Sequence, residues 1–167
     1  ADFRGAQING AQINESRFEQ ANLSKLDISG INWSRNDFSD AILSGADLTN
    51  TTWMECTFSR ADLRKTRLRN AALYHCRLNE TNLEETEISH TRFFGHDARK
   101  VNLEGSLLDT CRLEGLKLDE ACFERTRIRD STFSSSTFKG ATFRKSDLRS
   151  TLLTRCSLEG SDWTGSR

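Results

Sequence analysis

The sequence predicts an all-β solenoid, a fold in which one short unit repeats many times along a single axis. Three observations predict it. The 167-residue chain divides without interruption into 33 pentads, and 32 of their 33 central residues are Leu, Phe, Ile or Trp. All ten glycines occupy the last place of a pentad, and the chain contains no proline. A five-residue period matches neither an α-helix nor a plain strand, so the chain must turn once in every pentad.

Two places of each pentad are expected to face the core. The central residue is large, and the residue two places before it is Ala, Ser, Thr, Cys or Val in 28 of the 33 pentads. The glycines mark the fifth place as a corner, because glycine adopts positive φ at no steric cost. The absence of proline preserves the backbone N–H groups through which stacked coils bond to each other. Each pentad is therefore predicted to form one side of a coil.

These repeats resemble those of the pentapeptide-repeat family, whose consensus is Ala-(Asp/Asn)-Leu followed by two variable residues. The closest matches are Ala21-Asn22-Leu23, Ala46-Asp47-Leu48 and Ala61-Asp62-Leu63. The resemblance covers the whole chain and implies a right-handed quadrilateral parallel β-helix with four pentads in each coil. The chain would then make about eight coils, and at ~4.8 Å between stacked strands the rod would be on the order of 40 Å long.

We expect residues 1–165 to form one domain, with residues 166–167 as a tail. The chain starts in phase on a full repeat without a Met, and it shows no recognisable terminal cap. Since solenoids normally carry caps, we expect that the chain was excised from a longer protein. Unprotected coil ends also leave open a homodimer formed end to end. No apolar run approaches the ~20 residues of a membrane span, and no signal peptide is visible, so we expect no membrane partner.

The five cysteines are interpreted as free thiols rather than as a disulfide framework. Four of them occupy the small inward place and are expected to act as small apolar fillers, whereas the fifth lies at an outward place. The inward ones are Cys56, Cys76, Cys111 and Cys156, and the outward one is Cys122. Reduced thiols favour the bacterial cytoplasm, or a host cytosol if the chain is part of a secreted effector.

The pentad that departs most from the pattern is 96–100. His96 occupies a place that is otherwise small, and Ala98 is the one small residue among the centres. We interpret the pair as an exchange of volume and predict a local irregularity or bulge there. Cys56, Cys76 and His96 would stack in successive coils, which raises the question of a zinc site. No fourth ligand is evident and parallel side chains do not converge on a tetrahedron, so we expect neither metal nor cofactor.

Charge is balanced over the molecule, with 24 acidic and 24 basic residues. With four pentads in a coil, residues 20 apart stack in four columns, named here by their first centres the Phe3, Ile8, Ile13 and Phe18 faces. The four faces carry 7, 6, 3 and 8 acids and 7, 5, 4 and 7 bases. Some members of the resembled family mimic DNA and bind type II topoisomerases, which requires a coherent acidic surface. The chain lacks that surface, and it lacks the basic stripe of a nucleic-acid binder.

The Ile13 face is the poorest in charge, and it carries Met54, Tyr74 and Phe94 at the fourth place of three successive coils. Met54 and Tyr74 are the only Met and Tyr of the chain, and Phe94 is the one Phe that is not a centre. Two explanations stay open: the side chains shelter one another, or they form a protein-binding hot spot. Three residues are too few for a stable contact. A partner would also have to touch Arg92, Arg112, Glu55, Glu114 and His75.

The sequence shows no set of residues with a plausible catalytic arrangement, no phosphate-binding loop and no inserted loop that could form a pocket. We therefore expect a non-catalytic protein-interaction or scaffold module that binds another protein through the Ile13 face. Two alternatives remain. One is a DNA mimic that binds or inhibits a type II topoisomerase such as gyrase, and the other is a purely structural spacer in a larger protein, such as a secreted effector.

Overall fold

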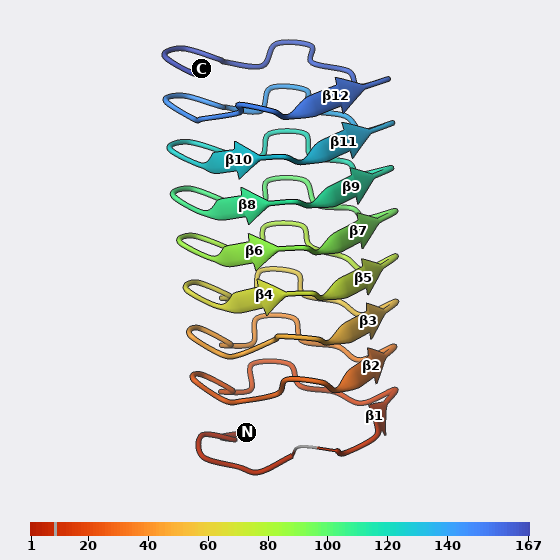
Figure 1. Cartoon of the computed structure of the whole chain (residues 1–167). Helices are drawn as coiled ribbons and strands as arrows, with labels where there is room; N and C mark the ends of the chain where they lie inside the picture. Colours follow the sequence, from red (N-terminus) through yellow and green to blue (C-terminus); the bar gives the residue numbers. More distant parts are fainter. Residues whose placement is uncertain (9) are drawn as a thin grey trace.

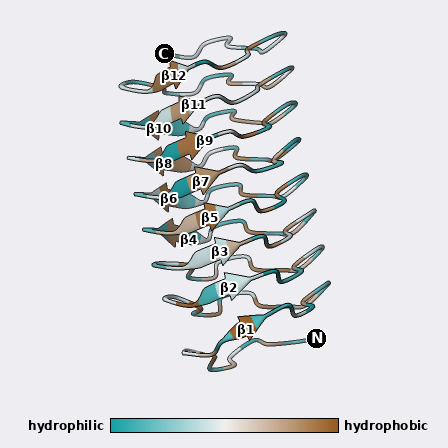
Figure 2. Ribbon diagram, turned by 90° about the vertical axis from the view of Figure 1, so that its right-hand side faces the viewer, coloured by the Kyte–Doolittle hydropathy of each residue, from teal (hydrophilic) through white to brown (hydrophobic). Residues whose placement is uncertain are grey.

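Stacked coils form one column in the computed structural model, with the two chain ends at opposite ends of the column (Figures 1 and 2). The structure describes residues 1–8 and 10–167. Within these residues there is no helix, and the strands pair in parallel. The predicted parallel β-solenoid is confirmed. The described part of the chain accordingly contains no helix of the length and apolar character that crossing a membrane requires.

The strands form two sheets, which follow the Ile8 and Ile13 faces and join residues 20 apart. The larger sheet comprises β1 (Ile13–Asn14), β2 (Asn32–Ser34), β3 (Thr52–Met54), β5 (Ala72–Tyr74), β7 (Arg92–Phe94), β9 (Arg112–Glu114), β11 (Thr132–Ser134) and β12 (Leu152–Thr154). The smaller sheet comprises β4 (Arg67–Arg69), β6 (Glu87–Ser89), β8 (Leu107–Asp109) and β10 (Arg127–Arg129). The eight strands of the larger sheet stack one per coil (Figure 1), in agreement with about eight predicted coils.

Every pentad ends in a residue with positive φ. The fifth place has φ between 48° and 78° in all 33 pentads, including the 23 in which it is not glycine. The corner that the glycines indicated is therefore present in each repeat. Thr110 has φ 53°, which is unusual because the branched Cβ of threonine is crowded in the left-handed region.

Two kinds of hydrogen bond complete the corners. After many pentads the carbonyl of the centre accepts a bond from the N–H three residues later, as in Ala46 N to Leu43 O at 2.9 Å and Ala61 N to Phe58 O at 2.9 Å. This is a β-turn with positive φ at its third residue. After the extended pentads of the Ile13 face, an inward side chain of the following coil can accept this N–H in place of the carbonyl. Ser136 Oγ, for example, accepts the Leu116 N–H at 3.1 Å.

The core is a column of stacked centres. Trp33 and Trp53 are parallel with ring centroids 5.1 Å apart, and Phe38 and Phe58 are 5.2 Å apart in the next column. Each buried centre contributes roughly 1.5–3 kcal/mol, most of which is offset by the entropy lost on ordering the chain.

The backbone hydrogen bonds between coils continue to the last residue, Arg167. Leu148 N donates to Arg167 O at 2.7 Å, and Arg167 N donates to Ser146 O at 3.1 Å. Residues 166–167 thus continue the repeat instead of forming a separate tail.

The pentad 96–100 keeps the backbone register, so the predicted bulge is wrong. Asp97 pairs with residues 77 and 117, and Ala98 N donates to Lys117 O at 2.9 Å. The irregularity lies in the side chains. Ala98 borders an apolar cavity of about 20 Å³ whose lining includes Leu78, Leu118 and Phe93 but not His96. His96 therefore does not fill the space that Ala98 leaves.

Ala98→Leu is expected to raise the free energy of unfolding by about 1–2 kcal/mol. The added carbon atoms would fill the cavity at ~0.8 kcal/mol each, reduced by some strain. Urea denaturation measures the change. The control is Ala121→Leu, at a fully buried small place, which should destabilise by about 1–3 kcal/mol through overpacking. Destabilisation of Ala98→Leu to the same extent would contradict the expectation, because it would show that the cavity does not accept the larger side chain.

Candidate functional site

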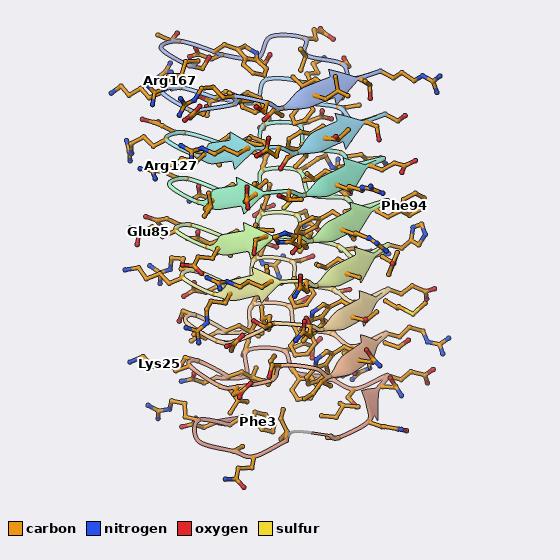
Figure 3. The ribbon with its side chains drawn as sticks, viewed as in Figure 1. Phe3, Lys25, Glu85, Phe94, Arg127 and Arg167 are labelled. Atoms are coloured by element: carbon orange, nitrogen blue, oxygen red, sulfur yellow. The ribbon has the colours of Figure 1, made fainter. Side chains whose placement is uncertain are left out.

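The three apolar side chains predicted to stack on the Ile13 face do lie on neighbouring strands. Met54 on β3 is in register with Tyr74 on β5, which is in register with Phe94 on β7. Met54 is 49% exposed and Phe94 is 41% exposed, while Tyr74 is half-buried between them. We call these three residues the apolar ladder. Figure 3 shows Phe94 on the outer side of the larger sheet.

His75 extends the apolar ladder at the adjoining corner. Its ring meets Phe94 edge to face, with centroids 5.2 Å apart and an interplanar angle of 86°. The glycine at the next corner makes room for it, because a Cβ on Gly95 would lie only 2.6 Å from His75 Nδ1. Glycine is therefore favoured at position 95 for two reasons: its φ is +69°, and the ring of His75 leaves no room for a Cβ.

Arg92 and Arg112 lie directly opposite each other on β7 and β9, beside the apolar ladder. Like charges at paired positions repel each other. Neither arginine forms an ion pair with any residue that the structure describes, whereas Arg35 on the same face pairs with Glu15 at 3.0 Å. Their guanidinium groups are thus available to an external carboxylate.

The two glutamates of the predicted contact complete a charged rim. Glu114 is the next residue after Phe94 in the stack, and Glu55 occupies the corner after Met54. Both are exposed. The face therefore has an apolar centre and a charged border, which is the usual composition of a protein–protein contact.

Ion pairs elsewhere on the surface mostly run along the column or within one pentad. Examples across coils are Arg60 with Asp40 at 2.8 Å and Arg67 with Asp47 at 3.0 Å. Within one pentad, Arg64 bonds to the Asp62 carboxylate at 2.8 Å and lowers its pKa. These pairs neutralise acids locally, which opposes the continuous acidic surface that mimicry of DNA would need.

His96 is buried at the corner beside the Ile13 face, where its ring replaces a turn hydrogen bond. Its Nδ1 accepts the Cys76 N–H at 2.8 Å, and its Nε2 lies 3.1 Å from Leu73 O and donates to it. Asn36 plays the same role three coils earlier: its Oδ1 accepts the Ser16 N–H at 2.9 Å, and its Nδ2 donates to Ile13 O at 2.8 Å. The partners of His96 are therefore backbone groups, which sequence reasoning left unnamed.

Burial keeps the groups of this inward column uncharged. It lowers the pKa of His96 to about 4 and raises the pKa of the Cys76 thiol to about 12. A buried thiol with a raised pKa is a poor nucleophile and a poor metal ligand. No cluster of three or more His, Cys, Asp or Glu residues suited to a metal occurs among the described residues.

Comparison with known families agrees with this architecture. The family described as "Pentapeptide repeat region" matches residues 46–123 and 106–167, and "Pentapeptide repeats (8 copies)" matches residues 16–52. The chain belongs to the pentapeptide-repeat family. Proteins of this family are in general structural or binding proteins without enzymatic activity. No curated protein matches the sequence.

Several solved structures are similar to this pentapeptide-repeat protein. The pentapeptide-repeat protein Rfr23 from the cyanobacterium Cyanothece is 15% identical, with a TM-score of 0.54 over 66% of this chain and 86% of that one. QnrB1, a plasmid-mediated fluoroquinolone resistance protein, is 15% identical, with a TM-score of 0.52 over 93% of this chain and 92% of that one. HetL, involved in heterocyst differentiation regulation in Nostoc, is 21% identical, with a TM-score of 0.39 over 95% and 87%. At these identities the likeness shows the fold alone.

His96 is expected to make stability depend on pH between about 6.5 and 4. Its pKa is lower in the folded protein than in the unfolded chain, so the unfolded chain takes up a proton first on acidification. The stabilisation that depends on neutral His96 should be fully present above pH 6.5. The free energy of unfolding should fall by on the order of 3 kcal/mol as the pH decreases to 4.

Denaturation midpoints measured across this pH range test the effect. His96→Asn should reduce the dependence of the free energy of unfolding on pH. The asparagine should keep both hydrogen bonds, because Asn36 makes the equivalent two at its own corner. His90→Asn changes an exposed histidine and leaves His96 in place, so its slope should match that of the unmodified protein. A slope that survives in His96→Asn would contradict the assignment.

Proposed function

We propose that this pentapeptide-repeat protein is a non-catalytic protein-interaction module that binds another protein through the Ile13 face. The observation that carries the proposal is the exposed apolar ladder beside two arginines that have no ion-pair partner among the described residues. Met, Tyr and Phe are typical of the centre of an interface, where they are shielded from water by a polar rim. A partner with apolar side chains flanked by carboxylates would complement this surface.

The backbone of this face is not available for strand addition. The strands β3, β5 and β7 are hydrogen-bonded on both sides within the larger sheet. Recognition must therefore proceed through side chains that a rigid sheet holds in place, which reduces the entropy lost on binding.

The contact has to be larger than the apolar ladder. A stable interface covers about 800 Å² on each partner, and three side chains supply only its centre. His75, Arg92 and Arg112 adjoin the ladder, and Glu55 and Glu114 lie at its two ends. These eight residues together span the four coils from β3 to β9, which suits a folded partner or a peptide lying along the column axis.

A spacer that only holds other domains apart would have no need for this surface. Exposed apolar patches bordered by polar residues are typical of interaction sites. The DNA-mimic alternative is disfavoured by the local pairing of acids with bases described above. A gyrase supercoiling assay separates that alternative, since a mimic would inhibit the reaction.

The double substitution Tyr74→Ser and Phe94→Ser is expected to weaken partner binding by at least about 30-fold, because truncation of even one hot-spot side chain costs about 2 kcal/mol or more. The control is Ile42→Ser, which removes an apolar side chain of similar exposure, 40%, from the Phe3 face.

The measurement is quantitative affinity capture from the source cells with the unmodified protein and both variants, followed by direct affinity measurement with the recovered partner. Circular dichroism should show that all three proteins melt alike. The proposal predicts partners that are retained by Ile42→Ser and lost by the double variant. Equal retention by the double variant, with the fold intact, would overturn it.

A further inference from the structure

A hollow of about 480 Å³ lies at the C-terminal end of the column, where the Phe3 and Ile8 faces meet. Its charged lining residues are Arg125, Arg127, Arg129, Lys145, Asp147 and Arg167. We call it the basic hollow. Figure 3 shows Arg127 and Arg167 on one side of the column and Phe94 on the other, so the basic hollow is separate from the Ile13 face.

The one carboxylate of the basic hollow is already occupied. Asp147 is 6% exposed, and Arg149 bonds to both of its oxygens, with Nε to Oδ1 at 2.8 Å and Nη2 to Oδ2 at 2.7 Å. Arg129 and Arg167 approach Oδ2 only to 3.6 and 3.8 Å, beyond hydrogen-bond distance. These two arginines therefore form ion pairs with Asp147 but no hydrogen bonds to it.

Two other cations of the basic hollow form no ion pair with a described residue. Arg125 is paired with Glu104 and Glu124, but neither Arg127 nor Lys145 has an ion pair with any residue that the structure describes. The basic hollow is thus lined by four cations and one carboxylate, Asp147, which is already hydrogen-bonded to Arg149. The four cations are Arg127, Arg129, Lys145 and Arg167.

Arginines at the same places of another coil on the Ile8 face do form ion pairs. Arg67 and Arg69 occupy the equivalent places of β4 and are both paired, with Asp47 at 3.0 Å and with Glu87 at 2.7 Å. At β10 the strand register places Arg127 between the apolar Leu107 and Asp147, whose carboxylate is hydrogen-bonded to Arg149. Unlike Arg67 and Arg69 at β4, Arg127 at β10 therefore forms no ion pair with a described residue.

We propose that the basic hollow binds a phosphoryl group, either as free phosphate or pyrophosphate or as part of a small phosphorylated molecule. Guanidinium groups present paired donors that match phosphate oxygens, and a phosphate group offers about two negative charges and several acceptors to the four cations. A single carboxylate would leave most of that charge uncompensated. The volume exceeds that of one phosphate, which leaves room for an attached organic group.

Isothermal titration calorimetry at physiological salt with pyrophosphate, inorganic phosphate and phenyl phosphate tests the site. Saturable binding of one ion per chain is expected. Arg127→Gln with Arg129→Gln should weaken it by at least about tenfold, and Arg67→Gln with Arg69→Gln, at the same places of a paired coil, should leave it unchanged. Tighter binding of phenyl phosphate would identify a phosphorylated molecule as the ligand class, and tighter binding of the inorganic ions would identify the free anion.

Lys145→Gln serves as a second variant, with a weaker but measurable loss expected, if the double variant melts at a lower temperature. The proposal is overturned if none of the three probes saturates at millimolar concentration, or if both double variants weaken binding equally. It is also overturned if duplex DNA binds and the three small anions do not, since the basic surface would then recognise a nucleic acid.

Discussion

The left-handed residue at the fifth place of every pentad is the constraint on which the rest of this structure depends. It turns the chain at the same point in each repeat, so that residues 20 apart meet and their backbone groups bond. Most of these corners are not glycine, and each such residue carries a conformational cost of about 1 kcal/mol. Hydrogen bonds between coils and the stacked core must offset this cost at every turn, so no repeat is stable alone.

The 20-residue spacing also determines what the surface can do. A side chain meets the same place of the coil below and of the coil above, so an acid beneath a base becomes an ion pair, as in Asp40 and Arg60. Apolar residues at the same spacing become the apolar ladder of Met54, Tyr74 and Phe94. Recognition is therefore expected where this local compensation is missing. Arg92 and Arg112 are one such place, and the basic hollow is another.

Much of the fold and part of the site could be predicted from the sequence because the repeat is strict. The period alone placed the corners, the core centres and the register of the apolar ladder. The role of His96 was missed, because the sequence gives no direct sign that inward side chains bond the N–H of the coil below. Asn36 in the same column was the available signal, since it is also a polar residue at an inward place.

The basic hollow was missed for a different reason. The total charge of the Ile8 face conceals it, because Asp27 and Asp47 in the first coils balance Arg127 and Arg129 near the other end. The hollow also draws Arg125 and Lys145 from the Phe3 face, and Arg167 from residues regarded as a tail. Counting charge by coil and by corner would have found it.

Thr110 offers the most direct test of the central role of the left-handed corner, since it is a β-branched residue at φ 53°. Thr110→Gly should raise the free energy of unfolding by about 1 kcal/mol through relief of strain, because glycine accepts this conformation. Thr132→Gly, in strand β11, should lower it by about 1 kcal/mol, because there glycine only adds freedom to the unfolded chain and loses strand propensity. Chemical denaturation of both variants decides the matter: opposite signs are predicted, and equal destabilisation would contradict the account.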